Sequence, residues 1–264
     1  MSKKIFLLAV ILLTIFFTGG CGSNSGGDEK SEPKVGTLTQ LNPSSQGEAI
    51  NFYENFNSMQ MALQSQNIDK IQTYQSVADY MTANNSEFAI ENSATVPLVD
   101  NFCCAMRADD VDLKNSFDAA IGDMKTDGTL DKLIGTFIKK FSTMPTAVEL
   151  PHFDDTETIR VGITGDLPPL DLVLADGTPA GFNTAVLSEI GKRLHKNIEL
   201  IQIDSGARAA ALTSGQVDVI FWVVVPQDDS RPKNFDTPDG VSVTTPYYQD
   251  TVVNVNLSNL GAGF

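Results

Sequence analysis

Two arginines, Arg208 and Arg231, carry the side chains best suited to bind a carboxylate. The planar guanidinium group can donate two parallel hydrogen bonds to such a group. Ser205 lies three residues before Arg208 and adds a hydroxyl group to the same segment. The alternative for Arg208 is a solvated arginine at the start of a helix. Trp222 is the one tryptophan of the chain, and it suits either a ligand contact or a place in the core.

Residues for catalysis are few. Asp166 and Asp171 are the loop carboxylates that could act as an acid and a base. We find no Ser-His-Asp set, phosphate-binding loop or zinc spacing, and we assign no role to His152 or His195. We therefore expect a protein that is not an enzyme and that has no cofactor and no metal.

The composition predicts an acidic globular protein. The chain has 264 residues, of which 42% are hydrophobic and 19% are charged. This length is enough for one large domain or two smaller ones. The formal net charge of −15 argues against a nucleic-acid partner, because phosphate binding needs a basic surface.

The first twenty residues have the pattern of an export signal. Lys3 and Lys4 precede an apolar run at 5–17 that is too short for a spanning helix. The segment 18–21 resembles a bacterial lipobox, which implies cleavage of a signal peptide at 1–20 and lipidation of Cys21. The alternative is an ordinary secretory signal. Residues 21–33 are rich in glycine, serine and charge and predict a flexible tether. We expect a lipid-anchored protein on the extracytoplasmic face of the cell membrane.

Alternating strands and helices predict an α/β fold. Strands are expected at 34–39, 49–53, 68–73, 88–90, 102–107, 158–163, 198–203, 217–225, 241–243 and 251–257. Helices are expected at 59–65, 76–82, 130–141 and 207–212, with two more capped by Asp110 and Asn183. Cys103 and Cys104 lie in an apolar stretch and are interpreted as buried thiols.

Several spaced motifs follow one another in the second half. They are Arg160-Val161-Gly162, Asp166-Leu167-Pro168-Pro169, Gly181-Phe182-Asn183, Leu212-Thr213-Ser214-Gly215-Gln216-Val217-Asp218 and Thr245-Pro246-Tyr247-Tyr248. In this order they resemble the first lobe of the extracellular solute-binding proteins of amino-acid ABC transporters (family 3). The resemblance covers residues 158–257.

The first half resembles the rest of the same family. The segments that carry this resemblance are 34–36, 61–69, 102–107 and 125–130. Second-lobe elements therefore precede first-lobe elements. The resemblance implies a two-lobed, periplasmic-binding-protein-like fold of type II in circularly permuted order. The alternative is a truncated tandem protein.

This interpretation divides the chain into segments. It predicts a second, small lobe at 34–107, helices that close onto the large lobe at 108–142, a linker at 143–157, a first, large lobe at 158–250, and a hinge strand with a C-terminal tail at 251–264.

The resemblance also implies a function. A monomer would capture a small polar solute, amino-acid-like or anionic, in an interlobe cleft and deliver it to the permease of an ABC importer. The implied ligand-binding residues are Asp166, Leu167, Pro168, Ser205, Arg208, Trp222 and Arg231 of the first lobe, with Thr39, Tyr74 and Gln75 of the second. The alternatives are a ligand-sensing module for a membrane receptor and a dehydratase or lyase on the same fold.

Four positions near the implied site depart from the family's pattern. Leu167 and Leu170 stand where the family usually has aromatic residues, and Asp228 replaces the threonine before the carboxylate-binding arginine. Tyr74 stands where the family has an aspartate for the ligand's amino group, and Thr39 and Gln40 end the strand that precedes an anion-binding loop in the family.

Overall fold

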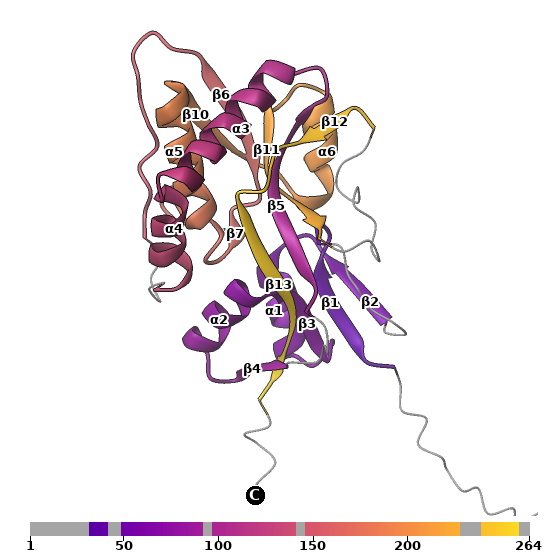
Figure 1. Cartoon of the computed structure of the whole chain (residues 1–264). Coiled ribbons are helices and arrows are strands. Elements are labelled where there is room, and N and C mark those ends of the chain that lie inside the picture. Colours follow the sequence, from indigo (N-terminus) through magenta and orange to yellow (C-terminus); the bar gives the residue numbers. More distant parts are fainter. Residues whose placement is uncertain (1–31, 42–48, 92–96, 141–145, 228–238, 259–264) are drawn as a thin grey trace, which may run out of the picture. The chain divides into compact units, whose positions relative to one another are not determined.

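The computed structural model describes residues 32–41, 49–91, 97–140, 146–227 and 239–258. The predicted signal peptide, Cys21 and Arg231 lie outside these residues. The helices are α1 (Phe56–Gln64), α2 (Gln75–Asn84), α3 (Val111–Thr126), α4 (Thr129–Leu133), α5 (Phe182–Leu194) and α6 (Arg208–Thr213), with a π-helical turn η1 (Ile134–Ile138) and a 3-10 turn η2 (Ser205–Ala207). Alternating with them, strands build the predicted α/β fold (Figure 1).

One part of the sheet, which we call the second-lobe sheet, contains the N-terminal strands. It consists of β1 (Lys34–Leu38), β2 (Ala49–Tyr53), β3 (Lys70–Tyr74) and β4 (Phe88–Glu91), together with part of β13 (Tyr248–Leu257). Its order is β2-β1-β3-β13-β4. The pairs β1–β2 and β1–β3 are parallel, whereas β13 runs antiparallel to both β3 and β4.

The other part, the first-lobe sheet, repeats this arrangement. It consists of β5 (Val99–Arg107), β6 (Thr158–Ile163), β10 (Asn197–Gln202), β11 (Val219–Pro226), β12 (Val241–Val243) and the start of β13. The order is β10-β6-β11-β5-β13, again with three parallel strands followed by an antiparallel one. A 2-1-3 order of parallel strands closed by an antiparallel strand in each sheet defines a two-lobed fold of type II.

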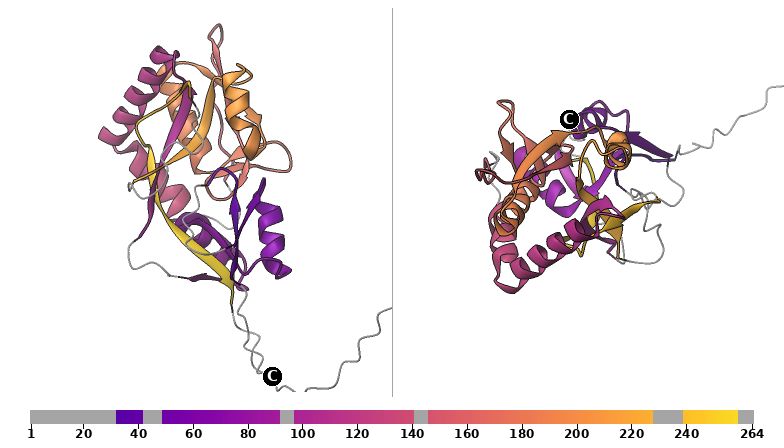
Figure 2. Two further views of the ribbon diagram at one scale, coloured as in Figure 1. Left: turned by 90° about the vertical axis from the view of Figure 1, so that its right-hand side faces the viewer. Right: turned by 90° about the horizontal axis from the view of Figure 1, so that it is seen from above.

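Two strands join the lobes. Residues 248–251 of β13 pair with β5 of the first lobe, and residues 252–257 pair with β3 and β4 of the second lobe. Figure 2 shows β13 from a second direction, running beside β5 and on to the second lobe. The crossing strands predicted at 102–107 and 251–257 are both present, and each begins three residues earlier than predicted.

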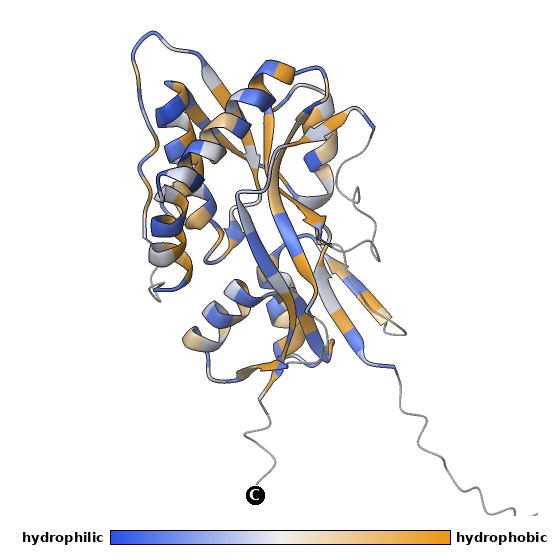
Figure 3. Ribbon diagram, in the orientation of Figure 1, coloured by the Kyte–Doolittle hydropathy of each residue, from blue (hydrophilic) through white to orange (hydrophobic). Residues whose placement is uncertain are grey.

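The core follows the predicted apolar patterns. Phe117, Ile121 and Met124 of α3 are fully buried, and β11 is apolar along its length, as expected of a strand covered on both faces (Figure 3). Cys103 and Cys104 are buried free thiols, as predicted. Burial raises the pKa of Cys103 to about 12, so this thiol stays protonated.

Asp218 fastens the outer end of the first lobe. Its carboxylate accepts hydrogen bonds from Arg160 Nε and Nη2 at 3.1 and 2.8 Å and from Arg107 Nη2 at 3.3 Å. Arg107 Nη1 also donates to the carbonyl oxygens of Leu212 and Val217. The motif at 212–218 therefore ties β5, β6 and β11 together.

One of the two predicted helix caps is wrong, and the other is correct in position alone. Asp110 is the N-cap residue of α3, but its side chain makes no cap bond and its carboxylate lies 2.7 Å from Arg107, three residues earlier. The cap of α5 is Gly181, since the helix already begins at Phe182. Asn183 lies inside the helix, where its side chain accepts a hydrogen bond from the Tyr247 hydroxyl group. In α5 a contact with a distant residue therefore takes the place of a local cap bond.

Two further elements differ from expectation. The helix predicted at 130–141 is a five-residue α-helix, α4, followed by η1. Strands β7 (Asp166–Leu167), β8 (Asp171–Val173) and β9 (Pro179–Ala180) form a small separate sheet that we did not predict. Within the predicted linker, residues 147–149 bind the first lobe through the carbonyl oxygen of Pro179 and the hydroxyl group of Ser188.

Candidate interlobe binding site

The loop after β6 contributes Asp166, Leu167 and Pro168. The backbone N–H groups of Phe182 and Asn183, at the start of α5, donate to carbonyl oxygens of this loop. Gly181 permits this approach, because its φ is +97° and a Cβ atom there would lie 2.8 Å from the carbonyl oxygen of Leu170. The N-terminus of α5 therefore fixes the loop in place.

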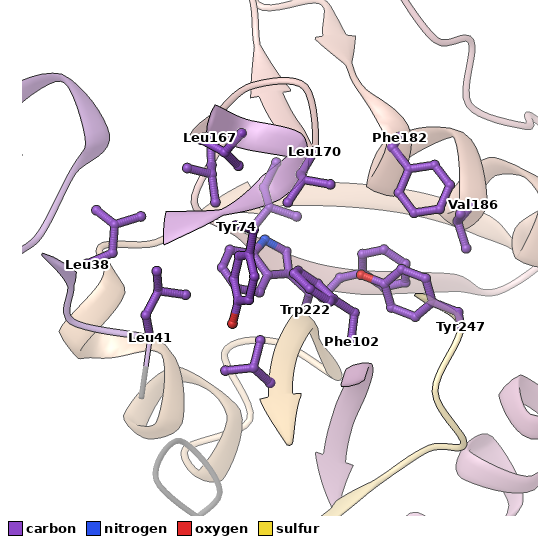
Figure 4. Close-up of a cluster of buried hydrophobic side chains, with 14 of the residues drawn as sticks. Leu38, Leu41, Tyr74, Phe102, Leu167, Leu170, Phe182, Val186, Trp222 and Tyr247 are labelled. Atoms are coloured by element: carbon purple, nitrogen blue, oxygen red, sulfur yellow. The ribbon is translucent and has the colours of Figure 1, made fainter. Parts of the chain in front are cut away.

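Leu167 and Leu170 face the protein interior. Both are fully buried, and Figure 4 shows them in one cluster with Tyr74, Phe102 and Trp222. They therefore add apolar packing where the lobes meet and bring no polar group.

Arg208 and Trp222 come together in the first lobe. The Arg208 side chain is 1% exposed, and its guanidinium carbon lies 5.3 Å from the centre of the Trp222 ring. This distance suits a cation–π interaction. Arg208 is thus no solvated arginine: it begins α6 just after the carboxyl end of β10, where α/β folds place ligands.

Tyr74 provides the second lobe's side of this cluster. Its ring packs edge-on against Phe102 at 4.8 Å, and its hydroxyl group donates to Asp100 at 2.8 Å. Phe102 in turn lies 5.3 Å from Trp222. A continuous aromatic contact therefore links Tyr74 of the second lobe to Trp222 of the first.

Four hydrogen bonds connect the lobes around this cluster. The N–H group of Phe56, at the start of α1, donates to Asp166 at 2.8 Å. The N–H group of Gln40 donates to Ser205 Oγ at 3.1 Å, and the Ser205 hydroxyl group donates to the Gln40 side chain. The N–H group of Gly206 donates to Glu54 at 2.9 Å. Polar groups of each lobe thus engage the other.

Two of the predicted site residues lie apart from the aromatic cluster. The Thr39 hydroxyl group binds Glu54 and the carbonyl oxygen of Tyr53, so it supports the Gly206 contact. The Gln75 amide group donates to Asp79 one turn along α2. Thr39 thus acts beside the site, and Gln75 binds within its own helix.

A pocket of about 320 Å³ opens beside this region. Asp166 and Pro168 line one wall, while Phe56 and Gln60 of α1 and Tyr80 of α2 line the other. Burial raises the pKa of Asp166, as do the nearby charges of Asp171 and Asp204, whereas the Phe56 N–H group lowers it. The pocket brings together elements of both lobes.

The sequence interpretation missed two buried carboxylates in the hinge. Asp100 and Asp250 stand opposite each other in the β5–β13 ladder and are 1% and 8% exposed. Asp250 accepts hydrogen bonds from Ser76 N and Oγ at 3.2 and 2.5 Å and from the Tyr248 hydroxyl group at 3.3 Å. It therefore holds the start of α2 to the hinge. Burial raises the pKa of Asp250, and these hydrogen bonds oppose the shift.

Comparisons with known proteins agree with this fold. Residues 159–259 match the family model described as bacterial extracellular solute-binding proteins, family 3. This confirms the resemblance inferred from the motifs of the second half. The matched region runs from β6 to β13 and is similar to the extracellular solute-binding proteins of this family. No curated protein matches the chain at a significant level.

Solved structures of similar proteins include two components of import systems. The ligand-binding component of an ABC-type import system from Staphylococcus aureus, solved with zinc bound, is 12% identical, with a TM-score of 0.45 over 88% of this chain and 67% of the other. A probable amino-acid ABC transporter extracellular-binding protein from Bacillus subtilis is 13% identical, with a TM-score of 0.39 over 88% and 86%. The GluR0 ligand-binding core from Nostoc punctiforme with L-glutamate is 9% identical, with a TM-score of 0.38 over 87% and 86%.

The described ranges contain neither a metal cluster nor a membrane-spanning helix. There, no group of three or more His, Cys, Asp or Glu side chains is arranged to hold a metal ion. None of the helices in the same ranges has the length and apolar character needed to cross a bilayer.

The raised pKa of Asp250 predicts a pH dependence of stability. A carboxyl whose pKa is higher in the folded protein stabilises the fold most below its ordinary value of 3.8, and this contribution is lost as the pH rises through the raised pKa. Chemical denaturation at several pH values above 3.8 should therefore show a free energy of unfolding that decreases with pH, and Asp250→Asn should reduce this slope. Asp154→Asn, at a side chain that is 98% exposed, is the control and should leave it unchanged. An identical slope in Asp250→Asn would contradict the prediction.

Proposed function

We propose that this protein captures a small, amino-acid-like or anionic solute between its two lobes and delivers it to an ABC importer. The observation that carries the proposal is the Arg208 guanidinium group, 1% exposed against Trp222 at the ligand-binding edge of the first-lobe sheet. A guanidinium group can donate two parallel hydrogen bonds to a carboxylate, so an arginine at such an edge suits an anionic ligand group. Ser205 lies on the same turn and reaches the second lobe through Gln40.

The hinge and the interlobe contacts support a capture mechanism. Because β13 belongs to both sheets and β5 pairs with its first residues, the lobes can rotate about these two strands without unfolding. The hydrogen bonds that the N–H groups of Phe56, Gln40 and Gly206 donate across the two lobes would break and re-form with each cycle of ligand binding and release. A closed form that differs from the open one gives a permease a state to recognise.

We further propose that the protein is monomeric and attached to the membrane by lipid on Cys21, with residues 21–33 as its tether. Removal of a signal peptide at 1–20 would expose this cysteine as the new N-terminus. The family match fits an extracytoplasmic location.

We also propose that the lobe order is a circular permutation. Val255 of β13 pairs with Ile71, and Ile71 pairs with Gly36, so Leu257 and Lys34 each lie two residues further toward the same edge of the sheet. Only β3 separates their strands, which places these ends about 10 Å apart. A short connection there would restore the family's order of first lobe and then second lobe.

A ligand screen tests the binding proposal. Amino acids, dicarboxylates and short peptides should include one that raises the melting temperature by about 5–10 °C at a hundredfold excess over Kd. Arg208→Ala should weaken that ligand about thirtyfold or more, because it removes a buried charge partner. Arg208→Lys, which keeps the charge but loses the planar fork, should be intermediate. Arg193→Ala, at a partly exposed ion pair with Asp127, is the control. Unchanged affinity in Arg208→Ala would exclude this site.

Metabolic labelling tests the lipid anchor. In a bacterial host fed a labelled fatty acid, the full chain should incorporate label and enter the membrane fraction, whereas Cys21→Ser should do neither. Cys103→Ser, at a buried thiol, should still be labelled. An exported but unlabelled wild-type chain would disprove lipidation.

A rearranged chain tests the permutation. Residues 146–258 followed by a short glycine-serine linker and residues 32–140 should fold as a monomer and bind the same ligand as the parent. Size-exclusion chromatography with light scattering and the ligand's thermal shift are the measurements. Domain-exchanged dimers of the parent chain would favour the truncated-tandem alternative.

A further inference from the structure

Asp171 is a buried carboxylate directly behind the candidate site. It begins β8, is 1% exposed, and gathers four hydrogen bonds on one oxygen, Oδ2. Three come from the loop after β6, from Thr164 N at 3.1 Å, Thr164 Oγ1 at 3.0 Å and Gly165 N at 3.1 Å. The fourth comes from Trp222 Nε1 at 3.3 Å.

The bond from Trp222 fixes the plane of the indole ring. Nε1 is the one hydrogen-bonding atom of this side chain, and the residue is fully buried. Phe102 packs against the ring at 5.3 Å with a tilt of 36°. Asp171 on the ring's polar edge and Phe102 beside it leave the indole one orientation.

Arg208 lies over this same ring, 5.3 Å from its centre. The attraction between a guanidinium group and an indole depends on the cation lying over the ring's face. Rotation of the indole would therefore move the preferred position of the guanidinium group as well.

We propose that Asp171 is a positioning residue for the anion-binding arginine, acting through Trp222. This inference rests on the function proposed for Arg208 and assigns Asp171 no contact with the ligand. The positioning depends on Oδ2 as a hydrogen-bond acceptor and not on a negative charge. Burial raises the pKa of Asp171 and so disfavours the charged form. The other oxygen, Oδ1, has no hydrogen-bond partner among the described residues.

This geometry makes asparagine a close substitute. Asp171→Asn keeps one oxygen acceptor for the four donors and places its amide nitrogen where Oδ1 now lies. Asp171→Ala removes the acceptor altogether. Thr164→Val removes one loop hydrogen bond to Oδ2 and leaves the Trp222 bond intact, so it serves as the matched control.

Affinity measurements on the full chain test the proposal, with L-glutamate and succinate as probes. Asp171→Ala should weaken binding about tenfold, the size of a lost cation–π interaction in a buried site. Asp171→Asn and Thr164→Val should bind within about twofold of wild type. In a Trp222→Phe background, Asp171→Ala should cause no further loss. Additive losses in the double variant, or full affinity in Asp171→Ala, would overturn the proposal.

Fluorescence separates this inference from the proposed function. Trp222 is the one tryptophan of the sequence, so its emission reports this environment alone. Without ligand, Asp171→Ala and Arg208→Ala should each shift the emission, whereas Thr164→Val should not. If wild type binds neither probe, the proposed anion capture loses its support, and the fluorescence emission still tests the positioning role of Asp171. Unchanged emission in Asp171→Ala would overturn that role, and a shifted emission would support it. If Asp171→Ala fails to fold, Asp171→Ser, with a hydroxyl group too short to reach the indole, takes its place.

Discussion

The backbone ladder of β13 is the constraint on which the two lobes depend. This one strand pairs with β5 over residues 248–251 and with β3 and β4 over residues 252–257. Buried backbone groups must keep their hydrogen-bond partners, so neither half of the ladder can separate cheaply. Relative motion of the lobes is therefore confined to the point where the partners change, next to Thr251. Asp100 and Asp250 lie beside that point, where they accept hydrogen bonds from Tyr74 and Ser76 of the second lobe.

Much of the fold was predictable because the strongest sequence signals are repetitive. The strands at 49–53, 158–163 and 241–243 have the predicted bounds, and the apolar stripe of α3 is buried as its spacing indicates. The family resemblance held for residues 159–259. Local signals were weaker. Asp110 and Asn183 have the residue types of helix caps, yet Asp110 binds Arg107 one turn earlier and Asn183 binds the distant Tyr247. Strands of two residues, such as β7 and β9, are too short to show any period.

The site was predictable only in outline. Residue type and motif position singled out Arg208, Ser205 and Trp222, and ring contacts through Phe102 link Trp222 to Tyr74. Their partners could not be inferred from spacing, since Ser205 meets Gln40 across 165 residues of chain and Gly206 meets Glu54 across 152. Asp171 was considered only as an acid or a base. Its actual surroundings depend on an indole nitrogen 51 residues away, and an acidic composition predicts solvated carboxylates rather than buried ones.

Asp218 shows that the motif at 212–218 has a structural role in the first lobe. This residue ends the motif at 212–218, yet its carboxylate binds Arg160 and Arg107 at the outer end of the first lobe and touches none of the proposed ligand-binding side chains. Selection for a stable lobe would preserve such a motif whatever solute the protein carries. The ligand can therefore change in evolution while the motif stays the same. A match to this motif identifies the fold of the lobe and not the solute that it binds.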